Sequence, residues 1–237
     1  MSEQYVLETR NLVKEFKGFV AVNDVNLQIR QGDIHALIGP NGAGKTTVFN
    51  LLTKFLIPTR GQILYRGEDI TPLKSAAIAR KGIVRSFQIS AVFPHMTALE
   101  NIRVALQTAE GSSYSFWKSG NSLHKLNERC MELLESVGLA EFANTTTVEL
   151  AYGRKRALEL ATTLAMEPQL LLLDEPTQGM GSEDVDRVVE LVCKAAQGRT
   201  VLMVEHNLSV VSKLCDRITV LAQGAVLTEG DYQTVSA

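Results

Sequence analysis

The chain has few cysteines and no apolar run long enough to cross a bilayer. Its three cysteines, Cys130, Cys193 and Cys215, are scattered and odd in number, which argues against a disulfide framework or a cysteine metal site. The longest apolar runs, such as 170–173, fall far short of the roughly 20 residues that a membrane helix needs. The N-terminus lacks a basic start followed by an apolar stretch, so we expect no secretory signal. These absences predict a cytosolic protein that reaches a membrane only through a partner.

A large charge of one sign is also absent. The 24 Lys and Arg residues nearly balance the 26 Asp and Glu residues, which argues against a nucleic-acid binder driven by bulk charge. The chain has 237 residues, and 45% of them are hydrophobic. This is enough for one globular α/β domain with a substantial core.

The order of predicted strands and helices divides this domain into two parts. Short or alternating apolar runs predict strands at 5–15, 20–30, 34–38, 61–65 and 83–87. From 97 to about 166 the apolar period is helical, with a surface loop at 110–121 and Gly138 as a helix C-cap. Strands and helices then alternate at 170–174, 182–197, 200–204, 208–214 and 218–222. We predict a single domain, 1–237, with a core and antiparallel-β lobe at 1–88 and 166–237 and a helical subdomain at about 89–165.

The most informative motif is a glycine-rich run between an apolar strand and a helix-like stretch. Its glycines let several backbone N–H groups point at one anion, and the helix start adds a partial positive charge. Lys45 can reach the β- and γ-phosphates of a nucleotide, and the Thr46 hydroxyl can bind Mg²⁺. The pattern predicts a phosphate-binding loop, rather than a simple turn, formed by Gly39, Pro40, Asn41, Gly42, Ala43, Gly44, Lys45, Thr46 and Thr47.

A second motif is a run of four leucines followed by two carboxylates, Asp174 and Glu175. The leucines predict a fully buried parallel strand, and α/β proteins bind ligands at the carboxyl ends of such strands. Asp174 is placed to hold Mg²⁺ through water, and Glu175 to polarise the water that attacks the γ-phosphate. A solvated acidic turn is the alternative, and the phosphate loop upstream argues against it.

Two more polar residues follow predicted strands. His206 can contact the γ-phosphate or orient the attacking water, and Gln88 can supply an amide oxygen to Mg²⁺. A lone histidine or glutamine at such a position is more often structural, so the positions alone decide neither role.

Taken in order, these motifs resemble those of the ATP-binding-cassette (ABC) ATPases over nearly the whole chain. The resemblance implies ATP and Mg²⁺ as cofactors, and an α/β P-loop fold with a mostly parallel core sheet, an antiparallel β subdomain and a helical subdomain. It also implies catalytic roles for Gln88 and His206 beside Glu175. It adds a signature segment whose amides bind the γ-phosphate of ATP held by a second subunit, formed here by Leu150, Ala151, Tyr152 and Gly153. In the family an aromatic near the N-terminus stacks on adenine. Phe16 is the best match and Phe19 the next, although both can equally be core residues.

The sequences of several segments are similar to those of one subgroup, the ATPase subunits of bacterial branched-chain amino-acid importers. Relatives of this subgroup serve urea and other amides. The segments are 46–50, 84–88, 93–97 and 100–102, together with the signature tyrosine. This resemblance implies a second ATPase subunit, identical or not, integral-membrane permeases, and a periplasmic binding protein as an indirect partner. It places the chain at the cytoplasmic face of the membrane, with apolar Val92, Phe93 and Met96 as a docking surface for the permease.

Three departures from the family pattern concern the contact between subunits. Ala151 stands where a serine is usual, and losing that hydrogen bond weakens ATP closure by roughly ten- to a hundredfold. Gly181 replaces the usual acid or asparagine of the D-loop, 178–182. The basic run 154–156 opens a helix, where cations oppose the helix dipole. We expect a solvated basic turn there, with a phosphate across the subunit interface as the alternative and nucleic acid disfavoured.

Two other function classes stay open from the sequence. One is an ABC ATPase of an exporter or a lipid-transport system on the same fold. The other is a soluble ATP switch acting in translation or DNA repair, whose members usually carry two cassettes or a long coiled-coil insertion, and neither is present here.

Overall fold

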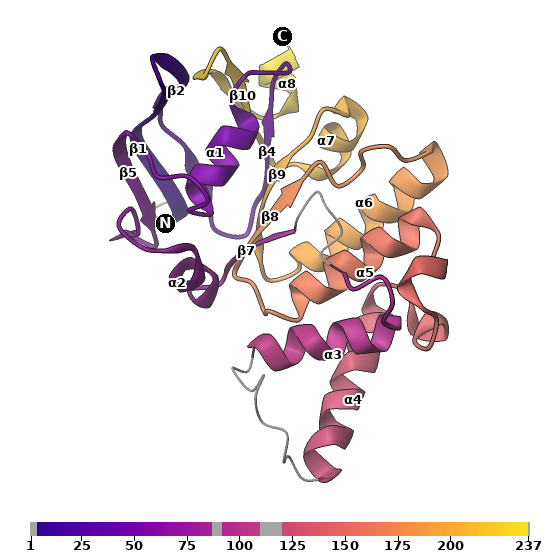
Figure 1. The fold of residues 1–237 in the computed structure, drawn as a ribbon. Helices are drawn as coiled ribbons and strands as arrows, with labels where there is room; N and C mark the ends of the chain where they lie inside the picture. Colours follow the sequence, from indigo (N-terminus) through magenta and orange to yellow (C-terminus); the bar gives the residue numbers. More distant parts are fainter. Residues whose placement is uncertain (1–3, 87–91, 110–119, 237) are drawn as a thin grey trace. The chain divides into compact units, whose positions relative to one another are not determined.

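The computed structural model describes residues 4–86, 92–109 and 120–236, which form two compact units (Figure 1). The first unit consists of Met1–Arg85, Gln169–Gln178 and Ala196–Ala237, and the second of Ser86–Pro168 and Gly179–Ala195. The predicted helical subdomain, about 89–165, falls within the first segment of the second unit, and the segment from Gly179 to Ala195 is a further part of that unit.

An antiparallel sheet in the first unit contains β1 (Tyr5–Phe16), β2 (Phe19–Val25), β3 (Gln28–Arg30), β5 (Arg60–Tyr65) and β6 (Glu68–Asp69). A two-residue turn joins β1 to β2, and its residues Lys17 and Gly18 both have positive φ, as the twist of such hairpins requires. The single strand predicted at 20–30 is wrong in one respect. Asp24, with φ of 55°, bends the chain, so β2 and β3 pair with different parts of β1.

The second sheet of this unit has the strand order β11-β10-β4-β9-β8-β7. Its strands are β4 (Ile34–Ile38), β7 (Ile83–Ser86), β8 (Leu170–Asp174), β9 (Thr200–Val204), β10 (Arg217–Ala222) and β11 (Ala225–Gly230). Strands β10, β4, β9 and β8 are parallel, whereas β11 runs antiparallel to β10. The strands predicted at 34–38, 170–174 and 200–204 are confirmed. Every residue of β8 and β9 is buried, as continuous apolar runs predict for a parallel sheet covered on both faces.

Helix α1 (Lys45–Leu52) lies between the two sheets, and its apolar side chains join them into one core (Figure 1). Four of its residues, Val48, Phe49, Leu51 and Leu52, are fully buried in this core. The unit also contains α2 (Ser75–Arg80), α7 (Leu208–Leu214) and α8 (Tyr232–Ser236). Because α1 follows the glycine-rich run directly, the packing that holds the sheets together also fixes the position of that run.

The second unit is helical in its described part, as the 3.6-residue period predicts. It contains α3 (Ala98–Ala109), α4 (Gly120–Ser136), η1 (Ala140–Phe142), η2 (Thr147–Glu149), α5 (Tyr152–Leu164) and α6 (Ser182–Ala196). Gly138 has φ of 70° just beyond the end of α4, which confirms the predicted C-cap. Most of the loop predicted at 110–121 lies outside the described residues, and its last two residues belong to α4.

A buried histidine lies on the strand that leads into the glycine-rich run. His35 on β4 is fully buried, and its Nε2 lies 2.7 Å from Oγ1 of Thr219 on β10. The Thr219 hydroxyl donates to Glu229, so it accepts the imidazole proton. Burial is the main cause that lowers the pKa of His35 to about 4, opposed in part by the charge of Glu229. His35 is therefore neutral in the folded chain at physiological pH.

This lowered pKa predicts a loss of stability on mild acidification. Unfolded His35 takes up a proton below about pH 6.5, whereas folded His35 does so only near pH 4. The contribution of neutral His35 to stability is therefore complete above the pKa of the unfolded state. We expect the free energy of unfolding to fall by about 2 kcal/mol from about pH 7 to about pH 5. Urea unfolding at both pH values, on the wild type and on His35→Gln, measures it. An equal pH dependence in the two chains would contradict the assignment.

Candidate nucleotide site

The glycine-rich run continues directly from β4 into α1. Gly39 has φ of 148°, and a Cβ there would lie 2.2 Å from the Leu221 carbonyl oxygen. Gly44 has φ of 100°, and a Cβ there would lie 2.6 Å from the Ala21 carbonyl oxygen. Only glycine fits at either position, so the run can wrap closely against β2 and β10.

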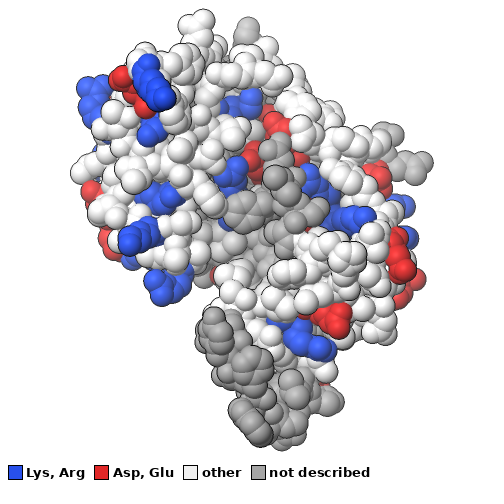
Figure 2. Space-filling view, in the orientation of Figure 1, with Lys and Arg blue, Asp and Glu red and all other residues white. Residues whose placement is uncertain are grey.

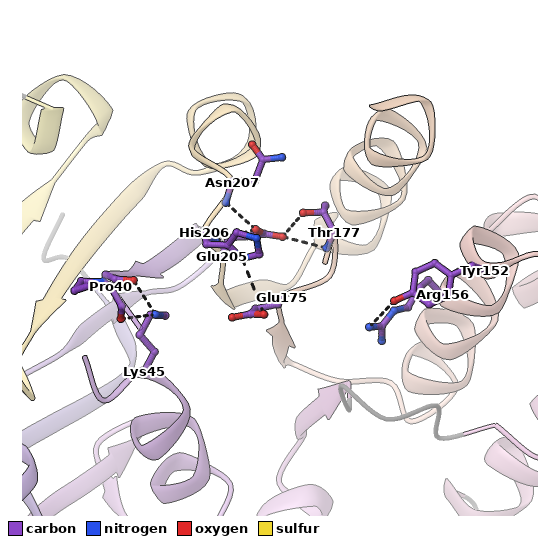
Figure 3. A network of polar contacts seen from close by, with 10 residues as sticks. Pro40, Lys45, Tyr152, Arg156, Glu175, Thr177, Glu205, His206 and Asn207 are labelled. Carbon is purple, nitrogen blue, oxygen red and sulfur yellow. Dashed lines mark hydrogen bonds and ion pairs between the residues drawn. The ribbon is translucent and has the colours of Figure 1, made fainter. Parts of the chain in front are cut away.

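Lys45, the first residue of α1, folds back over this run (Figure 3). Its Nζ donates to the carbonyl oxygens of Gly39 at 2.7 Å and Pro40 at 3.0 Å. The side chain is buried, with 7% of its surface exposed. The adjacent Thr46 is exposed at the start of the helix, so its hydroxyl is accessible. The loop thus holds an ammonium group and a hydroxyl at a helix N-terminus, the arrangement that binds phosphates.

Asp174 and Glu175 stand at the carboxyl end of β8. Asp174 is the last residue of the strand and pairs in register with Val204 of β9, which in turn pairs with Leu37 of β4. The ends of β4, β9 and β8 therefore lie level at one edge of the sheet. Parallel sheets bind ligands at this edge, next to the strand where the order reverses.

Glu175 and His206 lie side by side at this edge (Figure 3). Glu175 has a positive φ of 46°, which turns its side chain out of the line of β8. Its Oε2 lies 4.0 Å from Nδ1 of His206, which follows β9 and is more than half exposed. The sheet thus brings together the phosphate loop, both acids and the histidine that the sequence singled out. Gln88 lies outside the described residues.

The sequence reasoning missed one residue that organises this edge, Glu205. Its side chain is fully buried, and its two carboxylate oxygens accept four hydrogen bonds (Figure 3). Oε1 accepts from the backbone N–H and the hydroxyl of Thr177, and Oε2 accepts from the backbone N–H groups of His206 and Asn207. One carboxylate therefore fixes the segment after Glu175 to the segment that carries His206. The signal in the sequence was an acidic residue directly after the apolar strand β9.

The two aromatic candidates for adenine stacking lie opposite each other across the β1–β2 hairpin. Phe16 is 41% exposed and Phe19 is 67% exposed, so the alternative that they are core residues is wrong. The Nζ of Lys14 lies 5.0 Å from the centre of the Phe16 ring.

Comparison with known proteins identifies the class of site. The sequence model of the ABC transporter family matches residues 22–178. The chain belongs to this family.

Relatives that match over nearly their whole length support the assignment. The chain is 41% identical to the high-affinity branched-chain amino acid transport ATP-binding protein BraF of Pseudomonas aeruginosa, over 97% of this chain and 93% of that protein. It is 40% identical to LivG of Escherichia coli, which bears the same description, over 98% of this chain and 94% of that protein.

Solved structures of ATP-binding cassettes have the same fold as this chain. The ADP conformation of MJ1267, an ATP-binding cassette, has a TM-score of 0.84 at 28% identity, over 97% of this chain and 92% of that one. The dimeric cassette MJ0796 has a TM-score of 0.80 at 28% identity, over 95% of this chain and 98% of that one. The chain has the fold of these cassettes and is an ABC ATPase.

The segment that matches the ABC signature lies in the second unit, at the start of α5. Ala151 is the N-cap residue of α5 and makes no side-chain capping bond, because it lacks the usual hydroxyl. Tyr152 is half exposed, and its hydroxyl accepts from Arg156 at 3.3 Å. A Cβ on Gly153 would lie 3.1 Å from Asp184 on α6, so α6 packs closely against the signature glycine.

The basic run after the signature is solvated in part, since Arg154 is exposed and Lys155 and Arg156 are partly buried. The Arg154 guanidinium lies 4.0 Å from the centre of the Phe142 ring, and Lys155 donates to the Val148 carbonyl oxygen at 3.1 Å. Arg156 pairs with buried Glu159 at 2.8 Å. Each cation thus has a contact within the second unit, and the carbonyl beside Lys155 and the carboxylate beside Arg156 offset their conflict with the helix dipole.

The four hydrogen bonds of Glu205 predict how the site responds to Glu205→Gln. An amide has one acceptor oxygen, so at least two buried N–H or O–H donors lose their partner. We expect a loss of about 3 kcal/mol in the free energy of unfolding, and a roughly ten- to a hundredfold drop in ATP hydrolysis as His206 loses its anchor. Urea unfolding and phosphate release measure the two effects. Glu229→Gln is the matched control, because it alters a partly buried carboxylate of β11 away from the site. Equal hydrolysis by the two variants would contradict this role.

Proposed function

We propose that the chain is the ATPase subunit of an importer for branched-chain amino acids or related compounds. The observation that carries the ATPase part is the level ending of β4, β9 and β8, which gathers the loop of Lys45, both acids and His206. The substrate class is supported by the descriptions of the relatives BraF and LivG, which cover nearly the whole chain.

In this proposal ATP binds with its phosphates on the residues 39–47. Lys45 exchanges its two carbonyl partners for phosphate oxygens, and the Glu175 carboxylate accepts the proton of the attacking water. His206 lies close enough to Glu175 to hold the same water or the γ-phosphate. Phe16 stacks on the adenine ring. Gln88 is a further proposed ligand of Mg²⁺, and only the family pattern supports it.

The residues at this edge also fit Mg²⁺. The described part of the chain holds no cluster of three metal-binding side chains. Mg²⁺ at nucleotide sites instead needs one or two protein oxygens besides the phosphates, and the Thr46 hydroxyl and the Asp174 carboxylate are of this kind. The ion would neutralise the charge that develops on the phosphates.

We further propose that two such subunits, identical or not, bind ATP between them. The relative MJ0796 is a dimeric cassette. The segment 150–153 of one subunit would face the phosphate loop of the other, with the backbone N–H of Gly153 as a donor. Two of the departures from the family pattern, Ala151 and Gly181, would lie on this surface. Figure 2 shows Lys and Arg side chains scattered among Asp, Glu and uncharged residues on the face drawn, a mixture that favours a protein partner over nucleic acid.

Contact with integral-membrane permeases would place the chain at the cytoplasmic face of the membrane, with a periplasmic binding protein as an indirect partner. Among the helices that the structure describes, none has the length and apolar character to span a bilayer. Phe93 and Met96 of the second unit are 49% and 36% exposed, and suit a docking surface. Val92 does not belong to it as predicted, because it is 8% exposed and packs inward. Val148 joins the surface instead, since it is 55% exposed and its N–H donates to Pro94.

The role of Glu175 predicts the behaviour of Glu175→Gln. The amide cannot accept the proton of the attacking water, so we expect phosphate release to fall by at least about a hundredfold while ATP binding persists. An ATP-bound dimer should accumulate, which size-exclusion chromatography with and without ATP detects. Glu167→Gln is the control, since it changes an exposed carboxylate of the second unit. Near-wild-type hydrolysis by Glu175→Gln would contradict the role of Glu175 as the base.

The hairpin aromatics predict a difference between two variants. If Phe16 stacks on adenine, Phe16→Ala weakens ATP binding by roughly tenfold, the effect of losing one base–aromatic stack. Phe19→Ala should change the dissociation constant for ATP little. Isothermal titration of both variants measures this, and the reverse order of effects would assign the stacking role to Phe19.

A further inference from the structure

Arg85 on β7 is a buried cation that the sequence reasoning assigned to no role. Its side chain is 9% exposed and forms an ion pair with Asp174, whose side chain is 2% exposed. Its Nη1 donates to the Asn50 side chain at 2.7 Å, and the guanidinium lies 5.6 Å from the centre of the Phe49 ring. All of these residues belong to the first unit.

These contacts join two parts of the proposed nucleotide site. Phe49 and Asn50 lie on α1, the helix that begins with Lys45, and Asp174 ends β8. Arg85 itself stands three residues before Gln88, near the end of β7. One guanidinium group therefore contacts both the helix of the phosphate loop and the acid proposed to hold Mg²⁺.

The ion pair satisfies a carboxylate that would otherwise be costly to bury. A buried charge is tolerated only when it is paired and hydrogen-bonded, and Arg85 supplies both for Asp174. The same pairing opposes metal binding. The guanidinium occupies one carboxylate oxygen, and its positive charge repels a divalent cation that approaches the same carboxylate.

We propose that Arg85 is a positioning residue that sets the Mg²⁺ requirement of the nucleotide site. In the nucleotide-free chain it holds the Asp174 carboxylate in place through a charge-assisted bond. With nucleotide and Mg²⁺ bound, the Asp174 carboxylate would serve the metal, and its pair with Arg85 would weaken. This inference rests on the proposed function, in which Asp174 serves Mg²⁺.

The test compares the Mg²⁺ dependence of ADP binding in four chains, so that hydrolysis plays no part. Fluorescence titrations with a labelled ADP give the dissociation constant at a series of Mg²⁺ concentrations. The chains are the wild type, Arg85→Gln, Arg85→Lys and Arg217→Gln. Arg217 is the matched control because it pairs with Glu229 in the same sheet, at the opposite end of the strands from the phosphate loop.

We expect Arg85→Gln to reach half of its Mg²⁺-dependent gain in ADP affinity at about tenfold lower Mg²⁺, the size of losing one charge-assisted bond. Arg85→Lys keeps the charge and loses the planar contact with two partners, so a shift of about threefold is expected. Arg217→Gln should match the wild type. A merely structural Arg85 would lower thermal stability in the way that Arg217 does and would leave the Mg²⁺ midpoint unchanged.

The outcomes separate this inference from the proposed function. A Mg²⁺-dependent gain in the wild type with unchanged midpoints in both Arg85 variants, or with midpoints at higher Mg²⁺, would overturn the role of Arg85 alone. A wild type without any such gain would overturn the Mg²⁺ site of the proposed function, and this inference with it. If Arg85→Gln does not fold, Arg85→Lys decides, since an unchanged midpoint there also counts against the proposal.

Discussion

The parallel register of β4, β9 and β8 is the constraint on which the rest of the site depends. Because Leu37, Val204 and Asp174 lie level across three strands, the residues after each strand emerge at one edge. The phosphate loop, the acids and His206 come from segments far apart in the sequence, and no local motif could bring them together. Strands β8 and β9 are buried over their whole length, and a slip in register would separate the Asp174 carboxylate at the end of β8 from the Arg85 guanidinium.

The charged groups at this edge are each satisfied inside the first unit, and in different ways. Lys45 uses two backbone carbonyls, Asp174 uses a guanidinium, and Glu205 uses four N–H and O–H donors. The partners of Lys45 and Asp174 are of a kind that phosphate and Mg²⁺ can replace, because phosphate oxygens accept hydrogen bonds as the two carbonyls do, and Mg²⁺ is a cation as the guanidinium is. The partners of Glu205 are not, since its donors belong to the loops themselves. This difference separates the two groups that are proposed to bind ligands from Glu205, which holds the two loops of the site together.

Much of this arrangement could be predicted from the sequence, because the informative signals are local. A strand, a glycine run and a helix follow one another at 34–52, and four leucines precede Asp174. The roles of Glu205 and Arg85 could not be predicted, because each depends on partners on other elements, such as Thr177 for one and Asn50 for the other. The break between β2 and β3 was missed for a similar reason. It depends on a positive φ at Asp24, which Asp adopts more often than most residues but which the alternating apolar pattern of the segment does not reveal.

The signature segment shows how the same physics governs a surface that a second subunit would meet. At most helix starts a Ser, Thr, Asp or Asn side chain accepts a hydrogen bond from the first turn, whereas Ala151 supplies no acceptor. The first two turns of α5 also carry three cations, which contact Phe142, Val148 and Glu159. An arriving phosphate would therefore compete with no capping side chain, and only Arg154 among the three cations is exposed. Its binding would depend on backbone N–H groups and the helix dipole, which require close approach. Gly153 has no side chain that could obstruct this approach, although the Asp184 carboxylate lies close to it on one side. Closure of two subunits would then depend more on the fit of backbone surfaces than on the attraction of side-chain charges.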